Sequence, residues 1–246
     1  MELLYVATFC VALISSLLSG AAGSGGSFVM APYWLLAGFT PAQGAATGAF
    51  LALGIGAGSL TAFKGSEYLP RSRRFLWGLV AVTVITSMIG PFYLGRVSAE
   101  QFAPVLAILT LISTPFLFIP RDRLQFGIHT RRLGWLMITL VMLISSFVTS
   151  SVFSILITLL LVQVFKLSVL ESTIIRRCIG LFQSFVIFMI LMTLGNFLWQ
   201  HALAGLIGAI LGSYLGTSFA IARGERFAKW ALALSGAIGS AALLFV

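Results

Sequence analysis

The sequence predicts an all-α membrane protein that crosses the bilayer several times. Of its 246 residues, 59% are hydrophobic and 9% are charged, whereas a soluble domain carries about 25% charged residues. Several uncharged stretches also exceed the roughly 18 residues that one helical crossing needs. Backbone polar groups find no water in the bilayer, so such stretches are expected to be helical. We expect one transmembrane domain over residues 1–246, with no separate soluble module.

Two apolar segments are too long for a single crossing, and each is interrupted near its middle. The first covers residues 3–39 and is broken between Ser19 and Gly26; the second covers residues 133–165 and is broken between Ser145 and Ser151. Broken segments in corresponding positions of two halves are typical of transporter binding sites. The unbroken helices that we predict cover residues 41–63, 75–94, 102–119, 169–194, 201–221 and 227–246.

Charged loops orient these predicted helices. Most Lys and Arg residues lie in the loops near positions 70, 125 and 226, which are therefore expected to be cytoplasmic. Each broken segment then enters and leaves on one side, as a re-entrant hairpin, and the two tips are expected to meet near mid-membrane. We predict two inverted repeats, each made of such a hairpin plus three transmembrane helices. They would cover residues 1–119 and 131–246, joined by a cytoplasmic linker, residues 120–130, in a multi-pass protein of the cell inner membrane.

The first break has the composition of an anion site. Glycine lets the chain turn and leaves backbone N–H groups accessible, and the short helix that begins near Ser27 would point its positive end at the same place. We expect the anion to bind Ser24, Gly25, Gly26 and Ser27, with Gly23 shaping the turn. The structural alternative is a helix crossing that uses small residues for close packing.

The second break supplies hydroxyl groups. Thr149, Ser150 and Ser151 are expected to donate hydrogen bonds to the same anion. The alternative is that these side chains bond back to carbonyl groups of their own helix, as Ser and Thr often do.

An adjacent pair of arginines, Arg176 and Arg177, lies about eight residues, or roughly 12 Å, into the helix that begins near Ser168. An arginine that faces lipid costs about 2.5–3.5 kcal/mol. At least one of the two is therefore expected to face a polar cavity, where a guanidinium suits an oxyanion. The alternative is that both reach the membrane surface or pair with Glu171.

Acidic residues are missing from the middle of every predicted span. A proton-coupled carrier usually keeps such a group there, whereas an anion that leaves a negative-inside cell gains about 2.3 kcal/mol per charge per 100 mV without a coupling ion. The chain has no His-Glu-x-x-His motif and no membrane aspartate pair, so we expect no enzyme activity, metal or cofactor. Most of the Lys and Arg residues behind its net charge of +9 lie in short loops between spans, so we expect no nucleic-acid binding.

Several motifs resemble the TauE/SafE sulfite exporter family. They are Ser19-Gly20-x-x-Gly23-x-Gly25-Gly26, Pro32, Gly38-x-x-Pro41, Ala45-Ala46-Thr47-Gly48-Ala49 and the glycine spacing Gly205-x-x-Gly208-x-x-x-Gly212-x-x-x-Gly216. The resemblance implies transport of sulfite, sulfoacetate or related organosulfonates. It also implies that Gly25, Gly26, Pro32 and Thr47 bind the substrate or shape its site.

The second half departs from the family's pattern. It has Ser150-Ser151-Val152-Phe153-Ser154 where the family commonly repeats its glycine motif, and Ile174-Ile175-Arg176-Arg177 where a small-residue stretch would recur. We therefore expect a more cationic pocket, suited to a larger or doubly charged sulfonate. The expected partners are a small anionic solute and the lipid bilayer, and homo-oligomer formation stays open. An anion channel and a non-transporting scaffold or assembly protein are the alternative functions.

Overall fold

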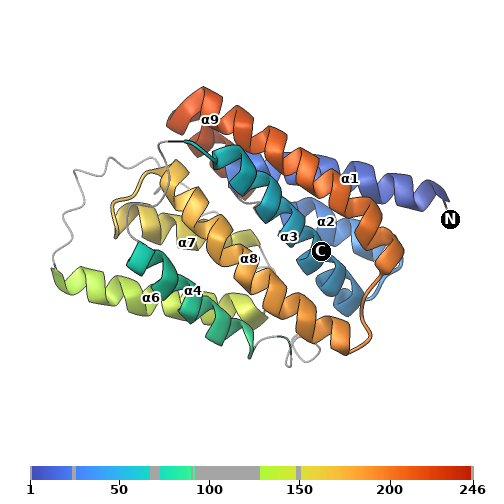
Figure 1. The fold of residues 1–246 in the computed structure, drawn as a ribbon, viewed down its shortest axis with the longest axis horizontal. Coiled ribbons are helices and arrows are strands. Elements are labelled where there is room, and N and C mark those ends of the chain that lie inside the picture. Colours follow the sequence, from blue (N-terminus) through green and yellow to red (C-terminus); the bar gives the residue numbers. More distant parts are fainter. Residues whose placement is uncertain are drawn as a thin grey trace.

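The computed structural model describes residues 2–23, 26–66, 73–89, 91, 128–147 and 151–244, and its regular elements there are helices (Figure 1). Four of them are long and apolar enough to cross a membrane, which confirms an all-α, multi-pass membrane protein. The helices are α1 (Glu2–Ala22), α2 (Gly26–Leu36), α3 (Pro41–Phe63), α4 (Arg73–Ser87), α6 (Ile128–Phe147), α7 (Ser151–Gln163), α8 (Val169–Thr193) and α9 (Trp199–Leu244).

The long helices pack side by side, with α3 against α8 in the middle of the molecule (Figure 1). On one side, α9 packs against α3 and α1 packs against α9. On the other side, α4 packs against α8 and α6 packs against α4. The short helices α2 and α7 touch each other and follow α1 and α6 as hairpins.

Both central helices begin at the residues that the sequence predicts. Thr40 caps α3, with its hydroxyl bonded to Gln43 N and the Gln43 side chain bonded back to Thr40 N. Ser168 and Glu171 form the same reciprocal capping box at the start of α8. Such boxes satisfy two of the backbone N–H groups that a helix start leaves open.

Several predicted boundaries are wrong; α4, for example, ends at Ser87 instead of near residue 94. Helix α1 continues to Ala22 instead of ending near Leu18, because the small residues remain helical until Gly23 adopts φ +73°. The loop predicted between the last two spans is reduced to a kink at Gly224 (φ +79°, ψ −175°) inside α9. The predicted span over residues 102–119 lies outside the described residues.

The two ends of the α3–α8 pair differ, and we name them by their buried basic residues. At the arginine end, Phe63 of α3 packs against Val169, Leu170 and Ile174 near the start of α8. At the histidine end, Phe50 of α3 packs against Phe188 of α8, and α9 begins beside them with Trp199 and His201.

The two helical hairpins open at opposite ends. The Tyr33 hydroxyl of α2 donates a hydrogen bond to Leu4 O near the start of α1, so this hairpin opens at the histidine end. Gly134, near the start of α6, faces Val164 and Phe165 just after α7, so the second hairpin opens at the arginine end. The two hairpins therefore enter the bundle from opposite sides.

Exposed basic side chains gather at the arginine end. Lys64 follows α3, Arg73 and Arg74 begin α4, and Arg223 and Arg226 flank the kink in α9. The positive-inside rule associates this distribution with the cytoplasmic face.

Glycine allows α1 and α9 to pack with their backbones in contact. A Cβ at Gly208 would lie 2.6 Å from Phe9 O, and one at Gly20 would lie 2.5 Å from Ser213 O. Real Cβ atoms do not come so close, so a larger residue would push the helices apart. This close packing fixes the end of α1, and with it the first break, against the rest of the bundle.

Candidate functional site

The first break lies directly against α8. Gly23 connects α1 to the break with φ +73°, and a Cβ there would lie 2.6 Å from Thr173 Oγ1 and 3.2 Å from Arg176 Nη2. A side chain at this position would meet both a strained backbone conformation and an occupied space. The glycine therefore allows the turn to approach the arginine pair.

The start of α2 is held beside the end of α1. The Ser15 hydroxyl of α1 donates a hydrogen bond of 2.7 Å to Gly26 O, and Gly26 is buried. A Cβ at Gly26 would lie 3.2 Å from the side chain of Ser19. The first turn of a helix has backbone N–H groups without partners in that helix. In α2 this turn begins next to Ser19, the residue that Arg177 contacts.

Arg177 ties α8 to α1. Its Nη2 donates hydrogen bonds to Ser19 O and, over 2.9 Å, to Ser19 Oγ. Only 8% of its surface is exposed. Ser19 lies in the last turn of α1, where helix carbonyls lack partners and a cation is favourable. Arg177 is thus partly satisfied by protein groups.

Arg176 has far fewer partners. It is 7% exposed, and among the residues that the structure describes its Nε and Nη2 atoms have no hydrogen-bond acceptor. Arg177 Nε and Ser172 Oγ, the latter one turn before Arg176, also lack partners. In the part of the chain that the structure describes, no carboxylate pairs with either guanidinium. Buried polar groups are nearly always hydrogen-bonded, so these buried donors need acceptors that the described side chains do not supply.

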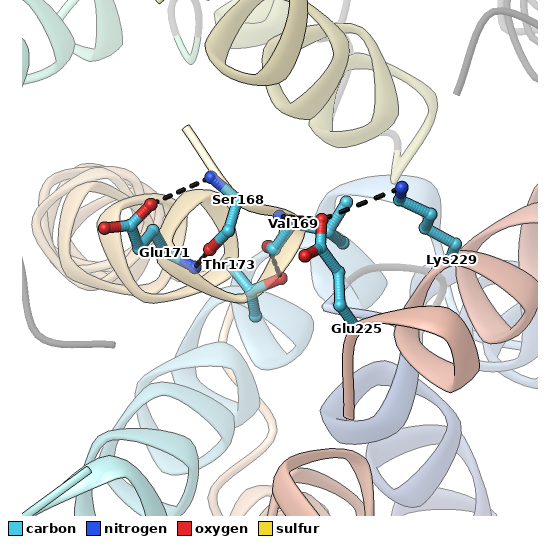
Figure 2. A network of polar contacts seen from close by, with 6 residues as sticks. All are labelled: Ser168, Val169, Glu171, Thr173, Glu225 and Lys229. Atoms are coloured by element: carbon cyan, nitrogen blue, oxygen red, sulfur yellow. Dashed lines mark hydrogen bonds and ion pairs between the residues drawn. The ribbon is translucent and has the colours of Figure 1, made fainter. Parts of the chain in front are cut away.

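The alternative in which both arginines reach the membrane surface or pair with Glu171 is wrong. Both side chains are buried, because each points inward from α8 towards the end of α1. The Glu171 carboxylate instead accepts a hydrogen bond of 2.8 Å from Ser168 N at the start of α8 (Figure 2).

A second carboxylate is also held at the start of α8. Glu225, next to the kink in α9, accepts a hydrogen bond of 3.4 Å from Val169 N and lies 3.7 Å from Lys229 Nζ (Figure 2). Val169 is seven residues before Arg176, which corresponds to about 10 Å of helix. The described acidic groups nearest in sequence to the arginines are thus bound to the helix terminus.

A chain of buried hydroxyls continues from the break into the bundle. Thr217 Oγ1 lies within hydrogen-bond distance of Gly20 O (3.3 Å) and Ser59 Oγ (2.9 Å), and Ser59 Oγ lies 2.6 Å from Ser213 Oγ. The sequence interpretation did not select these residues or Ser19. Ser19 opens the glycine motif described above, whereas the signal for the other three is only a polar residue inside an apolar span, and the sequence does not tell which helices meet there.

The structure separates one predicted site residue from the arginines. The neighbours of Thr47 on α3, Ala46 and Ala49, pack against Ile187 and Leu191 of α8. These α8 residues lie roughly 16–22 Å further along the helix than Arg176. Thr47 therefore belongs to the histidine end, because α3 and α8 run in opposite directions.

The remaining predicted site residues are described in part or not at all. Ser24, Gly25, Thr149 and Ser150 lie outside the described residues. Ser27 and Pro32 lie in α2 and Ser151 begins α7, but their side chains are outside the described part of the structure.

Comparison with known proteins agrees with this architecture. The family described as "Sulfite exporter TauE/SafE" matches residues 8–243, which include both hairpins, the arginine pair and the glycines of α9. No curated protein and no solved structure matches the chain. The chain belongs to the TauE/SafE sulfite exporter family of membrane transporters.

Proposed function

We propose that this protein exports small sulfur-containing oxyanions, such as sulfite, sulfoacetate or related organosulfonates, and that Arg176 provides their main countercharge. The observation that carries the proposal is the set of buried donors without acceptors at Arg176 Nε and Nη2, Arg177 Nε and Ser172 Oγ. A sulfite or sulfonate group presents three oxygens, which suits several donors on neighbouring residues of one helix.

The charge of the site favours a doubly charged substrate. Two guanidinium groups lie on adjacent residues, and burying a charge without a partner is costly. A dianion would neutralise both, whereas a zwitterion such as taurine brings a cation of its own. Sulfite and sulfoacetate are therefore the preferred substrate classes over taurine.

The packing order supports the proposal of two inverted repeats. From one side of the molecule the order is α1, α9, α3, and from the other side it is α6, α4, α8. In a pair of inverted repeats, α1 corresponds to α6, α3 to α8, and α4 to the first part of α9. The observed order follows this correspondence. We propose that the repeats are residues 1–119 and 131–246, and that Thr149, Ser150 and Ser151 approach the site from the second hairpin.

Transport in the outward direction needs no coupling ion. With the arginine end at the cytoplasm of an inner-membrane protein, an anion entering there meets the basic surface first and the arginine pair next. The membrane potential then favours exit by about 2.3 kcal/mol per charge per 100 mV.

A flux assay in proteoliposomes tests this function. Vesicles are loaded with sulfite, sulfoacetate or taurine, and efflux is followed with and without a potassium-diffusion potential. We expect saturable efflux of sulfite and sulfoacetate that accelerates when the inside is negative. Non-saturating flux would indicate a channel, and equal leak of all three solutes would indicate a non-transporting protein.

The matched variants are Arg176→Gln and Arg226→Gln. Arg226 is an exposed arginine beside the kink in α9, so its replacement controls for the loss of one positive charge. Arg176→Gln is expected to lose efflux and Arg226→Gln to retain it; equal effects of the two would remove Arg176 from the site.

A further inference from the structure

In the described part of the chain, two buried hydrogen-bond donors at the histidine end, far from the arginines, have no partner. Trp34 of α2 is 3% exposed and its Nε1 has no acceptor, while Thr47 of α3 is fully buried and its Oγ1 has no partner. The indole lies along one turn of α3: a Cβ at Gly44 would be 3.0 Å from Trp34 Cβ, and one at Gly48 would be 3.9 Å from Trp34 Nε1. Thr47 is part of this same turn.

The free hydroxyl of Thr47 is unusual in this protein. A threonine inside a helix normally donates to the carbonyl four residues earlier. The described threonines that do so are Thr8, Thr61, Thr83, Thr86, Thr139, Thr158 and Thr173. Because Thr47 has no such bond, its hydroxyl is left available to another group at the cost of an unsatisfied buried donor.

The surroundings of Trp34 form a wall of aromatic rings with fixed polar groups. The ring of His201 lies 6.4 Å from that of Trp34 and 4.9 Å from that of Phe39, between centroids. His201 Nδ1 lies 3.0 Å from Thr8 Oγ1, which lies 2.5 Å from the Tyr33 hydroxyl. His201, Thr8 and Tyr33 thus hydrogen-bond to one another and fix the aromatic rings in place, whereas Trp34 Nε1 and Thr47 Oγ1 have no partner among the described residues.

We infer that Trp34 and Thr47 form a second, weaker oxyanion site at the histidine end, which the substrate occupies after it leaves the arginines. This inference rests on the proposed function, because it concerns the same substrate. Indole N–H and hydroxyl groups donate to oxyanion oxygens without bringing a charge, and neutral donors bind an anion more weakly than a guanidinium does. A weak site near the exit favours release, whereas a second pair of buried cations would retain the anion.

Binding to the purified full-length protein in lipid nanodiscs tests the inference, with sulfoacetate as the probe. In the wild type we expect two phases in calorimetric titration, a tight one from the arginines and a weak one that also changes tryptophan emission. Thr47→Val removes the hydroxyl at nearly constant volume and is expected to weaken the weak phase about tenfold while leaving the tight phase unchanged. Trp34→Phe is expected to weaken the same phase and to remove its emission change.

Two controls make the outcome specific. Thr158→Val removes a buried hydroxyl that is bonded to its own helix at Ser154 O, so both phases should be unchanged. Thr47→Ser keeps a hydroxyl and should restore the weak phase.

The outcomes separate this inference from the proposed function. If Thr47→Val and Trp34→Phe both titrate like the wild type, or if the wild type has only the tight phase, the second site is refuted and the transport proposal stands. If the wild type binds no sulfoacetate in either phase, both fall. Arg176→Gln should remove the tight phase and keep the weak one.

Discussion

The arginine end and the histidine end of the α3–α8 pair both bury donors without acceptors, but the donors differ in charge. At the arginine end they belong mainly to two guanidinium groups next to a glycine turn. At the histidine end they are one indole N–H and one hydroxyl beside aromatic rings. Buried charge without a partner is far more costly than a buried neutral donor. We therefore expect the donors at the arginine end to contribute more to the binding free energy of an anion than those at the histidine end.

The largest expected effect comes from removing the charge of Arg176. Arg176→Gln should weaken sulfoacetate binding about a hundredfold, because charge-assisted hydrogen bonds to a buried oxyanion are lost. The same variant should be more stable than the wild type by about 1–2 kcal/mol without ligand, since a buried charge without a partner disappears. Calorimetry and thermal unfolding in one detergent measure both quantities. A variant that binds normally, or that is clearly destabilised, would contradict the claim that Arg176 is a buried charge without a partner that binds the anion.

The turn that brings the first break to Arg176 gives the next largest effect. Gly23→Ala combines a positive φ with a Cβ that would lie 2.6 Å from Thr173 Oγ1, and we expect a loss of about 2–3 kcal/mol in unfolding free energy. Gly65→Ala is the matched control. Gly65 shares the positive φ (+83°), but a Cβ there would have nothing within 4 Å. It should lose only about 1 kcal/mol. Equal losses would show that the close approach to α8 contributes nothing.

Arg177 should behave in the opposite way to its neighbour. Because it donates to Ser19 O and Ser19 Oγ, Arg177→Gln is expected to destabilise the protein by about 1–2 kcal/mol. Ser19→Ala, which removes one of these acceptors, should cost about 1 kcal/mol. Urea or thermal unfolding distinguishes the two arginines by sign. If Arg177→Gln also stabilises, then the Ser19 contact is not a net favourable interaction.

The smallest expected effect concerns the carboxylate at the start of α8. Glu225→Gln keeps a hydrogen-bond acceptor for Val169 N but removes the negative charge near the helix N-terminus, so we expect a loss of about 0.5–1 kcal/mol that shrinks at high salt. Glu2→Gln, at an exposed position in the first turn of α1, is the control for an exposed helix-terminal charge. A salt-independent loss at Glu225 would argue against an electrostatic role.

The sequence predicted local features well. The capped starts of α3 and α8 follow from Thr40 and Ser168, because capping depends on residues that are close in sequence. The depth of the arginine pair likewise follows from counting residues along one helix. The predicted end of α1 near Leu18 is too early. Residues Ser19 to Ala22 are all compatible with a helix, and Gly23 is the first residue with a left-handed backbone.

The sequence could not group residues that meet across helices. Thr47 was assigned to the same site as the arginines, although the antiparallel packing of α3 and α8 puts it at the other end. The contacts among Ser59, Ser213 and Thr217 were missed for the same reason. Which faces and levels of two helices meet depends on packing, and glycines of α3 make such contacts with both neighbours: Gly56 faces Leu181 of α8, and Gly58 faces Ile210 O of α9.

The most direct test of the anion site compares ligand-dependent stabilisation of the wild type and Arg176→Met in a thermal-shift titration with sulfoacetate. A ligand that binds only the folded state raises the unfolding temperature with concentration. We predict that the wild-type temperature rises at ligand concentrations within the tight phase. The Arg176→Met protein should begin at a higher temperature and stay there over the same range. An equal rise in both proteins would contradict the assignment of Arg176 as the countercharge.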